Sequence, residues 1–481
     1  MRCLRIALLE DDHDERLNRS QSLTQFSKSA VALLSADESS CIEKLGGQSI
    51  CIGECCAGMG SGTIVAHAVQ HALIGMNIKC PTLDTAFFTE CVEWKRKLCR
   101  DVYEHIHGRE KPVKLFERTA ELVKSSGVSC QLCISAIECD DVSPCSTTPK
   151  SFLDRNGKSG SSFLEFLDYL KSSNLNQRPD WLLIECVAAL QKKRKLKESV
   201  EKGTDVVVKH LLELGYTGEF RTLNTVHFGL PQSRTRTYGV FVKLTLGFGP
   251  ESRKVHDNQV ANVWGICARC QSRTPESLYS LLKRSDLQKA CIAEEKNMKQ
   301  AQGKRKPNKQ QKWHTEHDGF RNRHGLNELG HQPEGEDFSA LRVLRDNMQS
   351  DIGLSEREAD AALLCLGATL AAKPDLASSK CMVVPVGDSI GRMRFGFTVH
   401  PCLLPKKKYL YLVDGKLYVS GKSSKVPLML QGIDHEELLL AGPAIQNLGP
   451  AEAQELCGNS FTANIVGVLL LAILANWSAA C

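Results

Sequence analysis

A cysteine in a polar loop and a glutamate at the end of a buried strand are the residues of this sequence best suited to nucleophilic chemistry. Cys145 lies in DDVSPCSTTP, a loop rich in proline, serine and threonine, where a substrate can reach its thiol. Glu185 follows 40 residues later (185 − 145), at the end of the apolar run WLLIECV. A carboxyl group in such partly apolar surroundings can have a raised pKa and act as a proton donor. The two residues therefore predict a nucleophile that works beside an acid.

A glycine-rich turn and a second acidic residue suggest a site for a nucleotide-like ligand. The segment ECCAGMGSG joins a buried strand to a helical stretch and contains Cys56, Ala57, Gly58 and Gly60. Glycine lets the backbone approach a ligand closely, although a plain tight turn has the same composition. Glu90 ends the next strand, TAFFTE, where a carboxylate can accept hydrogen bonds from both hydroxyls of a ribose. An ordinary exposed glutamate at a strand end is the alternative.

A glutamine and two arginines come just before a later buried strand. Gln232, Arg234 and Arg236 alternate in HFGLPQSRTRTYGV. Alternate residues of an extended segment share one face, so we expect both arginines to point into the same cleft. Arginine there suits a carboxylate, a phosphate or the edge of a base. A surface ion-pair site is the alternative for such a pair.

The elements around these residues predict an α/β domain. Between residues 48 and 243, apolar runs of strand length alternate with amphipathic helical stretches, for example from Glu93 to Ile106. Strands separated by helices predict a doubly wound, mostly parallel sheet. Ligands of such sheets bind beyond the carboxyl ends of the strands, which is where Glu90 and Glu185 are expected.

The composition is that of an ordinary folded protein. Hydrophobic residues make up 42% and charged residues 24% of the 481 residues, which excludes a fibrous or disordered chain and suggests two or three lobes. The 21 cysteines are scattered through apolar segments, so we expect mostly free, buried thiols. The net charge of +6 is compatible with a polyanionic partner but does not require one. No secretory leader pattern or apolar run of membrane-spanning length is visible, so we expect an intracellular protein that does not cross a membrane.

The rest of the chain divides into three further parts. We expect residues 1–47 to form an N-terminal extension, with disorder as an alternative, because they are charged, serine-rich and weakly patterned. Residues 244–397 form a second region with a strongly polar and basic insertion. The apolar pattern returns over residues 398–481 and ends in NIVGVLLLAILANW.

The order of these segments resembles the cytosine-5 DNA methyltransferase family. That family runs from a glycine loop and a ribose-binding acid to a Pro-Cys loop, a Glu-x-Val strand and a Gln-x-Arg-x-Arg segment. The sequence has each of them in that order, and LMLQGI and CGNSFTANIVGVLL are similar to the closing motifs. The resemblance covers about residues 48–243 and 398–477. It implies a Rossmann-like methyltransferase sheet, with residues 244–397 as a smaller target-recognition lobe.

The resemblance also implies an activity, that of a DNA (cytosine-5-)-methyltransferase using S-adenosyl-L-methionine. Cys145 would add to cytosine C6, while Glu185, Arg234 and Arg236 would stabilise the ring and hold the base, and Gln232 would contact the substrate. The target cytosine must leave its stack to reach the thiol. The residues implied for the cofactor are Cys56, Ala57, Gly58, Gly60, Glu90, Asn459 and Ser460.

Three positions close to these residues depart from the family pattern. Ser146 follows the nucleophile where glutamine is usual, Cys186 stands where asparagine is usual, and Cys56 replaces an aromatic residue that stacks on the cofactor adenine. A non-catalytic nucleic-acid-binding scaffold is therefore one alternative function. Methylation of transfer RNA is another, but the Cys-Phe-Thr signature typical of such relatives is absent from the sequence.

Partners and location are predicted from weaker signals. We expect DNA as the partner, a monomer, no bound metal, and a nuclear location suggested by the basic runs QKKRKLK and GKRKPNKQQK. A zinc site is the alternative for Cys267, Cys270, His314 and His317, although the separation of 44 residues (314 − 270) exceeds the usual spacings.

Overall fold

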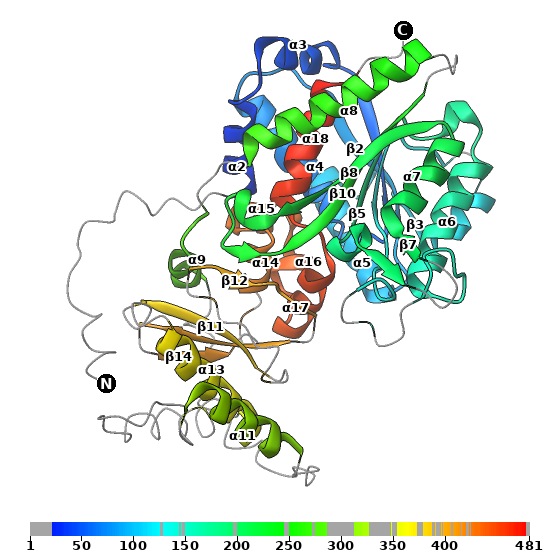
Figure 1. Cartoon of the computed structure of the whole chain (residues 1–481). Helices are drawn as coiled ribbons and strands as arrows, with labels where there is room; N and C mark the ends of the chain where they lie inside the picture. The colour runs from blue at the N-terminus through cyan, green and yellow to red at the C-terminus, as the bar shows by residue number, and fades with distance from the viewer. Residues whose placement is uncertain are drawn as a thin grey trace.

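A seven-stranded sheet forms the centre of the computed structural model (Figure 1). Its order is β3-β2-β1-β4-β5-β10-β8. Strand β10 runs antiparallel to both of its neighbours, and the remaining pairs are parallel. The order moves outward from β1 in both directions, which confirms the predicted doubly wound, mostly parallel sheet. The strands are β1 (Ser49–Cys55), β2 (Thr82–Thr89), β3 (Lys114–Phe116), β4 (Leu132–Ala136), β5 (Trp181–Val187), β8 (Tyr216–Asn224) and β10 (Thr235–Lys243).

Helices cover both faces of this sheet, and strand β5 shows why. Trp181 and Leu183 belong to the hydrophobic core on one face, whereas Leu182 and Ile184 belong to the core on the other. Because successive strand residues point to opposite faces, a strand between two helix layers must be apolar throughout. The first core includes α4 (Ser61–Gly75), α8 (Pro250–Cys270) and α18 (Ala463–Ala475), and the second includes α6 (Lys158–Ser172) and α7 (Gly203–Glu213).

The apolar C-terminal stretch forms helix α18, and all of its residues are buried inside the protein. Among the described residues, no single helix has the length and apolar character needed to span a membrane. Helix α17 (Pro450–Asn459) and α18 together meet these criteria by length and composition, with a bend of 44° between them.

The N-terminal segment is ordered over its described part. Residues 22–47 contain α2 (Leu23–Val31) and α3 (Ala36–Lys44), and the side chains of Leu23 and Phe26 are fully buried in the core that includes α4 and α18. The expectation of a separate extension is therefore wrong for residues 22–47, and so is the alternative of disorder. Sequence patterning missed this packing because the apolar partners of α2 lie far away along the chain.

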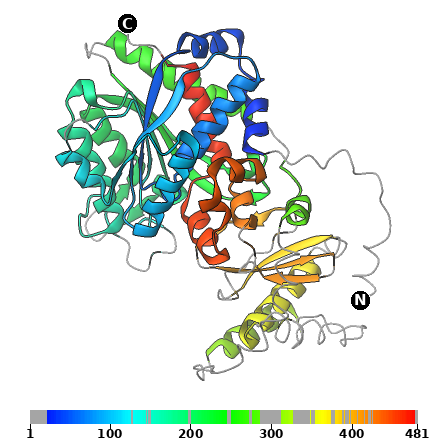
Figure 2. The ribbon, with the colours of Figure 1, turned by 180° about the vertical axis from the view of Figure 1, so that it is seen from behind.

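A smaller lobe carries a three-stranded antiparallel sheet with two helices beside it (Figures 1 and 2). The strands are β11 (Cys381–Val386), β13 (Lys408–Val413) and β14 (Lys416–Val419), and the helices are α11 (Lys312–His324) and α13 (Glu356–Ala372). The expected boundaries of this lobe, 244 and 397, need correction at both ends. Helix α8 packs on the large sheet, and strands β13 and β14 complete the small one.

The remaining elements lie around the large sheet or between it and the small lobe. They are α5 (Glu93–His107), β6 (Lys193–Lys195), β7 (Val200–Lys202), β9 (Gln232–Ser233), α9 (Leu278–Arg284), β12 (His400–Pro401), α14 (Lys425–Leu430), α15 (His435–Ala441) and α16 (Pro443–Gln446), with short 3-10 turns between them.

The structure describes residues 22–125, 128–143, 146, 150–195, 200–244, 250–271, 275–285, 312–326, 348, 354–372, 379–386, 390, 396, 398–405, 407–414, 416–419, 423 and 425–477. Cys145 lies outside these ranges.

Candidate active site

The clearest chemical pair of the site is Glu185 with Arg236. Glu185 lies near the carboxyl end of β5, and its Oε1 atom is 3.3 Å from Nε of Arg236. Burial raises the pKa of the Glu185 carboxyl, and the positive charges of Arg236 and Arg234 offset only part of that rise. Such an acid can keep a proton at higher pH than a surface glutamate and donate it to a substrate.

Strand pairing explains why these two side chains meet. In the antiparallel pair of β5 and β10, Glu185 is opposite Tyr238 and Arg236 is opposite Val187. Glu185 and Arg236 are therefore diagonal neighbours, at a spacing that a long arginine side chain spans easily. On its other side β5 pairs with β4, where Ala136 is the partner of Glu185. The segment that leads toward Cys145 thus leaves the sheet next to Glu185.

Arg234 has a different environment from Arg236. Its side chain is 1% exposed, and its two terminal nitrogens donate to the carbonyl oxygens of Leu403 (3.2 Å), Gly458 (3.2 and 3.3 Å) and Ser460 (2.5 Å). The expectation that both arginines face a cleft is therefore wrong for Arg234. The extended segment is broken at this residue, because β9 pairs with β12 in one sheet and β10 pairs with β5 and β8 in another.

The side chain of Gln232 also forms its hydrogen bonds with the protein backbone. Its Nε2 donates to the carbonyl of Leu430 at 2.7 Å, its Oε1 accepts from the amide of Leu403 at 3.5 Å, and the residue is fully buried. The structure favours a structural role for Gln232 over the predicted contact with substrate. Gln232 and Arg234 together hold the C-terminal segments against the large sheet.

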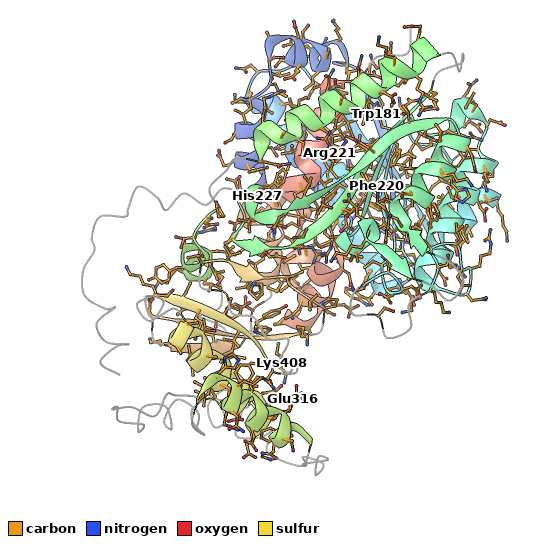
Figure 3. All side chains as sticks on the ribbon, viewed as in Figure 1. Trp181, Phe220, Arg221, His227, Glu316 and Lys408 are labelled. Carbon is orange, nitrogen blue, oxygen red and sulfur yellow. The ribbon has the colours of Figure 1, made fainter. Side chains whose placement is uncertain are left out.

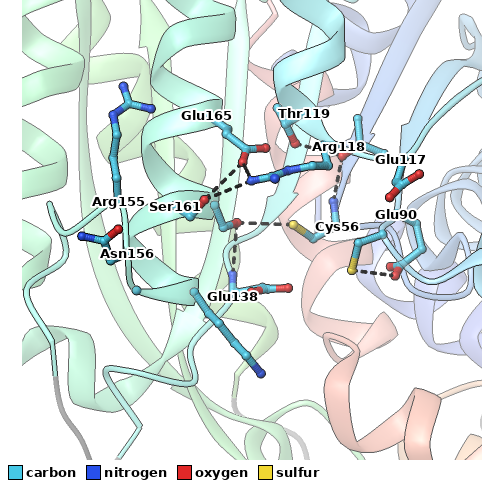
Figure 4. A pocket seen from close by; sticks show the side chains of 15 residues that line it. Cys56, Glu90, Glu117, Arg118, Thr119, Glu138, Arg155, Asn156, Ser161 and Glu165 are labelled. Carbon is cyan, nitrogen blue, oxygen red and sulfur yellow. Dashed lines mark hydrogen bonds and ion pairs between the residues drawn. The ribbon is translucent and has the colours of Figure 1, made fainter.

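A cavity of about 480 Å³ lies at the carboxyl ends of β1, β2 and β4, against α6 (Figure 4). The Glu90 carboxylate lines it and accepts hydrogen bonds from the amides of Gly58 (2.9 Å) and Val92 (3.0 Å). The thiol of Cys56 also lines it, 3.5 Å from the hydroxyl of Ser162. The lining residues are Cys56, Thr89, Glu90, Cys91, Glu117, Arg118, Thr119, Glu138, Arg155, Asn156, Gly157, Lys158, Ser161, Ser162 and Glu165.

The glycine turn lies beside this cavity and is built from left-handed backbone. Cys56, Gly58 and Gly60 have φ values of 56°, 62° and 72°. Glycine adopts this region without strain, whereas Cys56 is strained there. Thr89 holds this backbone in place: its hydroxyl accepts a hydrogen bond from the amide of Cys56 at 3.2 Å, and its carbonyl accepts one from the amide of Ala57 at 3.0 Å. Of the predicted cofactor residues, Cys56 and Glu90 line the cavity. Ala57, Gly58 and Gly60 form the turn next to it.

The last two predicted cofactor residues lie elsewhere. Asn459 is exposed at the end of α17, and Ser460 is buried with its carbonyl bonded to Arg234. Neither residue lines the cavity.

Sequence reasoning missed a buried acid beneath the glycine turn. The Glu54 carboxylate accepts hydrogen bonds from the amide of Gly62 (3.0 Å), the amide of Thr63 (2.7 Å) and the hydroxyl of Thr63 (2.6 Å). Burial raises the pKa of Glu54 to about 7 in spite of these bonds. Glu54 thereby fixes the first turn of α4, which begins at the glycine turn. An acidic residue inside the apolar run SICIGECC was the available signal.

A second missed feature ties together the two ends of the loop that carries Cys145. The amide of Asp141 donates to the Ser159 hydroxyl at 3.0 Å, and the amide of Ser159 donates to the Asp141 carboxylate at 2.8 Å. Asp141 is 8% exposed and Ser159 is fully buried. Ser159 lies in the first turn of α6, but Asp141 precedes that helix by 17 residues (158 − 141), so no local pattern signals this pair.

The four zinc candidates do not form one site. Cys267 and Cys270 are buried on α8 in the core of the large body, whereas His314 and His317 are on α11 in the small lobe (Figure 1). Nδ1 of His317 is 2.7 Å from the carboxylate of Asp360. Within the described ranges, no three or more His, Cys, Asp and Glu side chains are grouped so that they could hold a metal ion.

The sheet order, the cavity at the strand ends and the buried acid define a Rossmann-like methyltransferase fold. The model of the C-5 cytosine-specific DNA methylase family matches residues 86–353, and the chain belongs to this family.

Solved structures of methyltransferases are similar at low sequence identity. Dnmt2 of S. pombe is 16% identical, with a TM-score of 0.41 and coverage of 88% of this chain and 98% of that chain. The methyltransferase EhMeth of Entamoeba histolytica is 11% identical, with a TM-score of 0.45 and coverage of 89% and 98%. A prophage-encoded DNA modification methyltransferase from E. coli is 10% identical, with a TM-score of 0.42 and coverage of 88% and 98%. No curated protein matches the sequence significantly.

Proposed function

We propose that this protein transfers a methyl group from S-adenosyl-L-methionine to C5 of cytosine in DNA, with Cys145 as the nucleophile. The observation that carries the proposal is the buried Glu185 carboxyl, paired with Arg236 beside the strand end from which the Cys145 loop starts. A cytosine placed there has an acid and a guanidinium next to it, and family membership supplies the reaction class.

The residues of the cavity fit the proposed cofactor. The volume of about 480 Å³ is within the usual range for a small-molecule site, which is roughly 300–1,000 Å³. Each Glu90 oxygen accepts one backbone hydrogen bond and keeps lone-pair capacity for a ribose hydroxyl. Cys56 offers a small apolar contact where the family has an aromatic ring. When bound, the cofactor supplies an electrophilic methyl group on a positively charged sulfur.

In the proposed mechanism the chain acts mainly on the base. The Cys145 thiolate adds to C6 of cytosine, and electron density moves to C5, which then takes the methyl group. Glu185 shares its proton with N3 and so neutralises charge that builds on the ring. Arg236 orients Glu185 and stabilises the carboxylate that remains when the proton is given up. A base then removes the C5 proton, the C5–C6 double bond forms again and Cys145 leaves as a thiolate, while N3 returns its proton to Glu185.

Several features support DNA as the nucleic acid. The family is described as acting on DNA, and the sequence lacks the Cys-Phe-Thr signature of transfer-RNA relatives. Exposed basic residues of the small lobe, among them Lys408 (Figure 3) and Arg323 of α11, suit contacts with phosphates. We further propose a nuclear location, on the basis of the basic runs.

Methyl transfer from labelled cofactor to duplex DNA and to transfer RNA, measured side by side, tests this proposal. We expect label in DNA, a large loss in Glu185→Gln, and normal transfer in Glu219→Gln, a control acid that pairs with Arg221 on the exposed face of β8. Label in transfer RNA alone would overturn the DNA assignment. A folded protein that binds nucleic acid but neither binds the cofactor nor transfers label would support the scaffold alternative.

A further inference from the structure

Glu138 is an acidic residue of the cavity whose carboxylate forms no ion pair or hydrogen bond with the residues that the structure describes. It follows β4 and is half-buried, and its backbone amide donates to the hydroxyl of Ser162 at 3.5 Å (Figure 4). Burial, followed by the negative charge of Asp140, raises the pKa of Glu138, and the positive charge of Lys158 offsets only part of that rise.

The cations that line the cavity have other acidic partners. Arg118 pairs with Glu165, Arg155 with Asp168 (2.9 Å) and Lys158 with Asp140 (2.8 Å). The carboxylate of Glu90, another acid of the cavity, is held by backbone amides. Lys158, which pairs with Asp140, offsets the negative charge of Glu138 only in part, so a cationic group of a ligand in this cavity would be stabilised next to Glu138.

The position of Glu138 indicates which part of the cofactor it meets. The preceding residue, Ile137, donates its amide to the carbonyl of Glu185 at 3.2 Å. The charge of Glu185 also contributes, after burial, to raising the pKa of the following thiol, Cys139, to about 11. Glu138 thus lies where the cofactor cavity borders the acid that holds the base. The methyl group must cross this border, so the sulfur that carries it must lie there.

We propose that Glu138 recognises the positively charged sulfur of bound S-adenosylmethionine and selects this cofactor over its neutral product, S-adenosylhomocysteine. The inference rests on the proposed cofactor use and deepens it. The attraction exists before methyl transfer and is lost when the sulfur becomes a neutral thioether, so Glu138 favours release of the product and entry of fresh cofactor.

Calorimetric titration of the full-length protein with each of the two ligands tests this role. In Glu138→Gln we expect the affinity for S-adenosylmethionine to fall about tenfold and the affinity for S-adenosylhomocysteine to change less than about twofold. Glu138→Asp, which keeps the charge, should keep most of the selectivity. Glu117→Gln is the matched control, because Glu117 lines the same cavity but is 61% exposed and 4.0 Å from Arg96. The selectivity of wild type should also shrink at high salt.

The outcomes separate this inference from the function on which it rests. If wild type binds both ligands and a folded Glu138→Gln variant loses the same affinity for each, Glu138 does not select the charged cofactor. That result would leave the proposed function intact. A Glu117→Gln variant that loses selectivity as strongly as Glu138→Gln would also overturn the role of Glu138 and leave the proposed function intact. Wild type that binds neither ligand would overturn the proposed cofactor use, and the inference with it.

Discussion

Replacing Arg234 should destabilise the fold before it affects the chemistry. In Arg234→Ala, the carbonyls of Leu403, Gly458 and Ser460 lose their donor in a buried environment. Each unsatisfied buried acceptor costs about 1 to 3 kcal/mol, so the sum is roughly 3 to 6 kcal/mol after some relaxation. That is a large share of the free energy of unfolding of an ordinary domain, which is about 5 to 15 kcal/mol.

Urea denaturation followed by tryptophan fluorescence measures this loss, and Arg234→Lys provides a milder variant in case the alanine variant does not fold. Arg236→Ala is the comparison, because it removes the partner of Glu185 and should abolish methyl transfer. Its cost in stability should be smaller, since Glu185 already has a raised pKa and can take up a proton. An Arg234→Ala variant with the wild-type denaturation midpoint but no activity would refute this account. It would restore Arg234 to a direct role on the substrate.

Glu90→Ala should weaken S-adenosylmethionine binding by about 1 to 3 kcal/mol in calorimetry, because the ribose loses its acceptor; unchanged affinity would remove Glu90 from the site. Glu54 has a folded pKa of about 7 against 4.5 for the ordinary carboxyl, so the folded state binds more protons between these values and stability falls as the pH rises through them. The loss in the free energy of unfolding approaches ~3 kcal/mol above pH 7. Glu54→Gln should remove this part of the pH dependence of the free energy of unfolding, and a pH dependence equal to that of wild type would contradict the interpretation of Glu54 as a buried acid. Asp141→Ala and Ser159→Ala should each slow the reaction of Cys145 with a trapping base while leaving cofactor affinity unchanged, and the double variant should be no slower than either; additive effects would show that the two residues act separately.

The positions of Glu90 and Glu185 at the ends of strands were predicted from the sequence and are confirmed by the structure. Glu90 and Glu185 each close an apolar run, and the parallel sheet brings the ends of β1, β2, β4 and β5 to one edge. Local sequence patterning is enough to predict these positions, because the side-chain period of a strand and the geometry of a parallel sheet fix where residues at strand ends lie. The fold class followed from the same alternation of strands and helices.

The features that the sequence did not predict depend on distant partners. Arg234 and Gln232 are held by carbonyls that lie more than 150 residues away, so no local pattern separates them from residues that face a cleft. Helix α2 has an apolar face, which includes Leu23, Phe26 and Ala30, but its sequence alone does not show that this face packs on α4 and α18. Glu138 differs from the neighbouring acids Asp140 and Asp168, which form ion pairs with Lys158 and Arg155. This difference can be seen only in the folded structure.

A covalent trap tests the central claim most directly. A duplex that carries 5-fluorocytosine at the target blocks the final elimination, because fluorine cannot leave C5 as a cation after methyl transfer. With a protein first shown to methylate unmodified DNA, we predict a stable adduct that peptide mass spectrometry maps to Cys145. The adduct should be absent in Cys145→Ala and slow in Glu185→Gln, which retains the thiol but lacks the acid. An active protein that forms no adduct, or an adduct on another of the 21 cysteines, would contradict the assignment of Cys145 and the mechanism built on it.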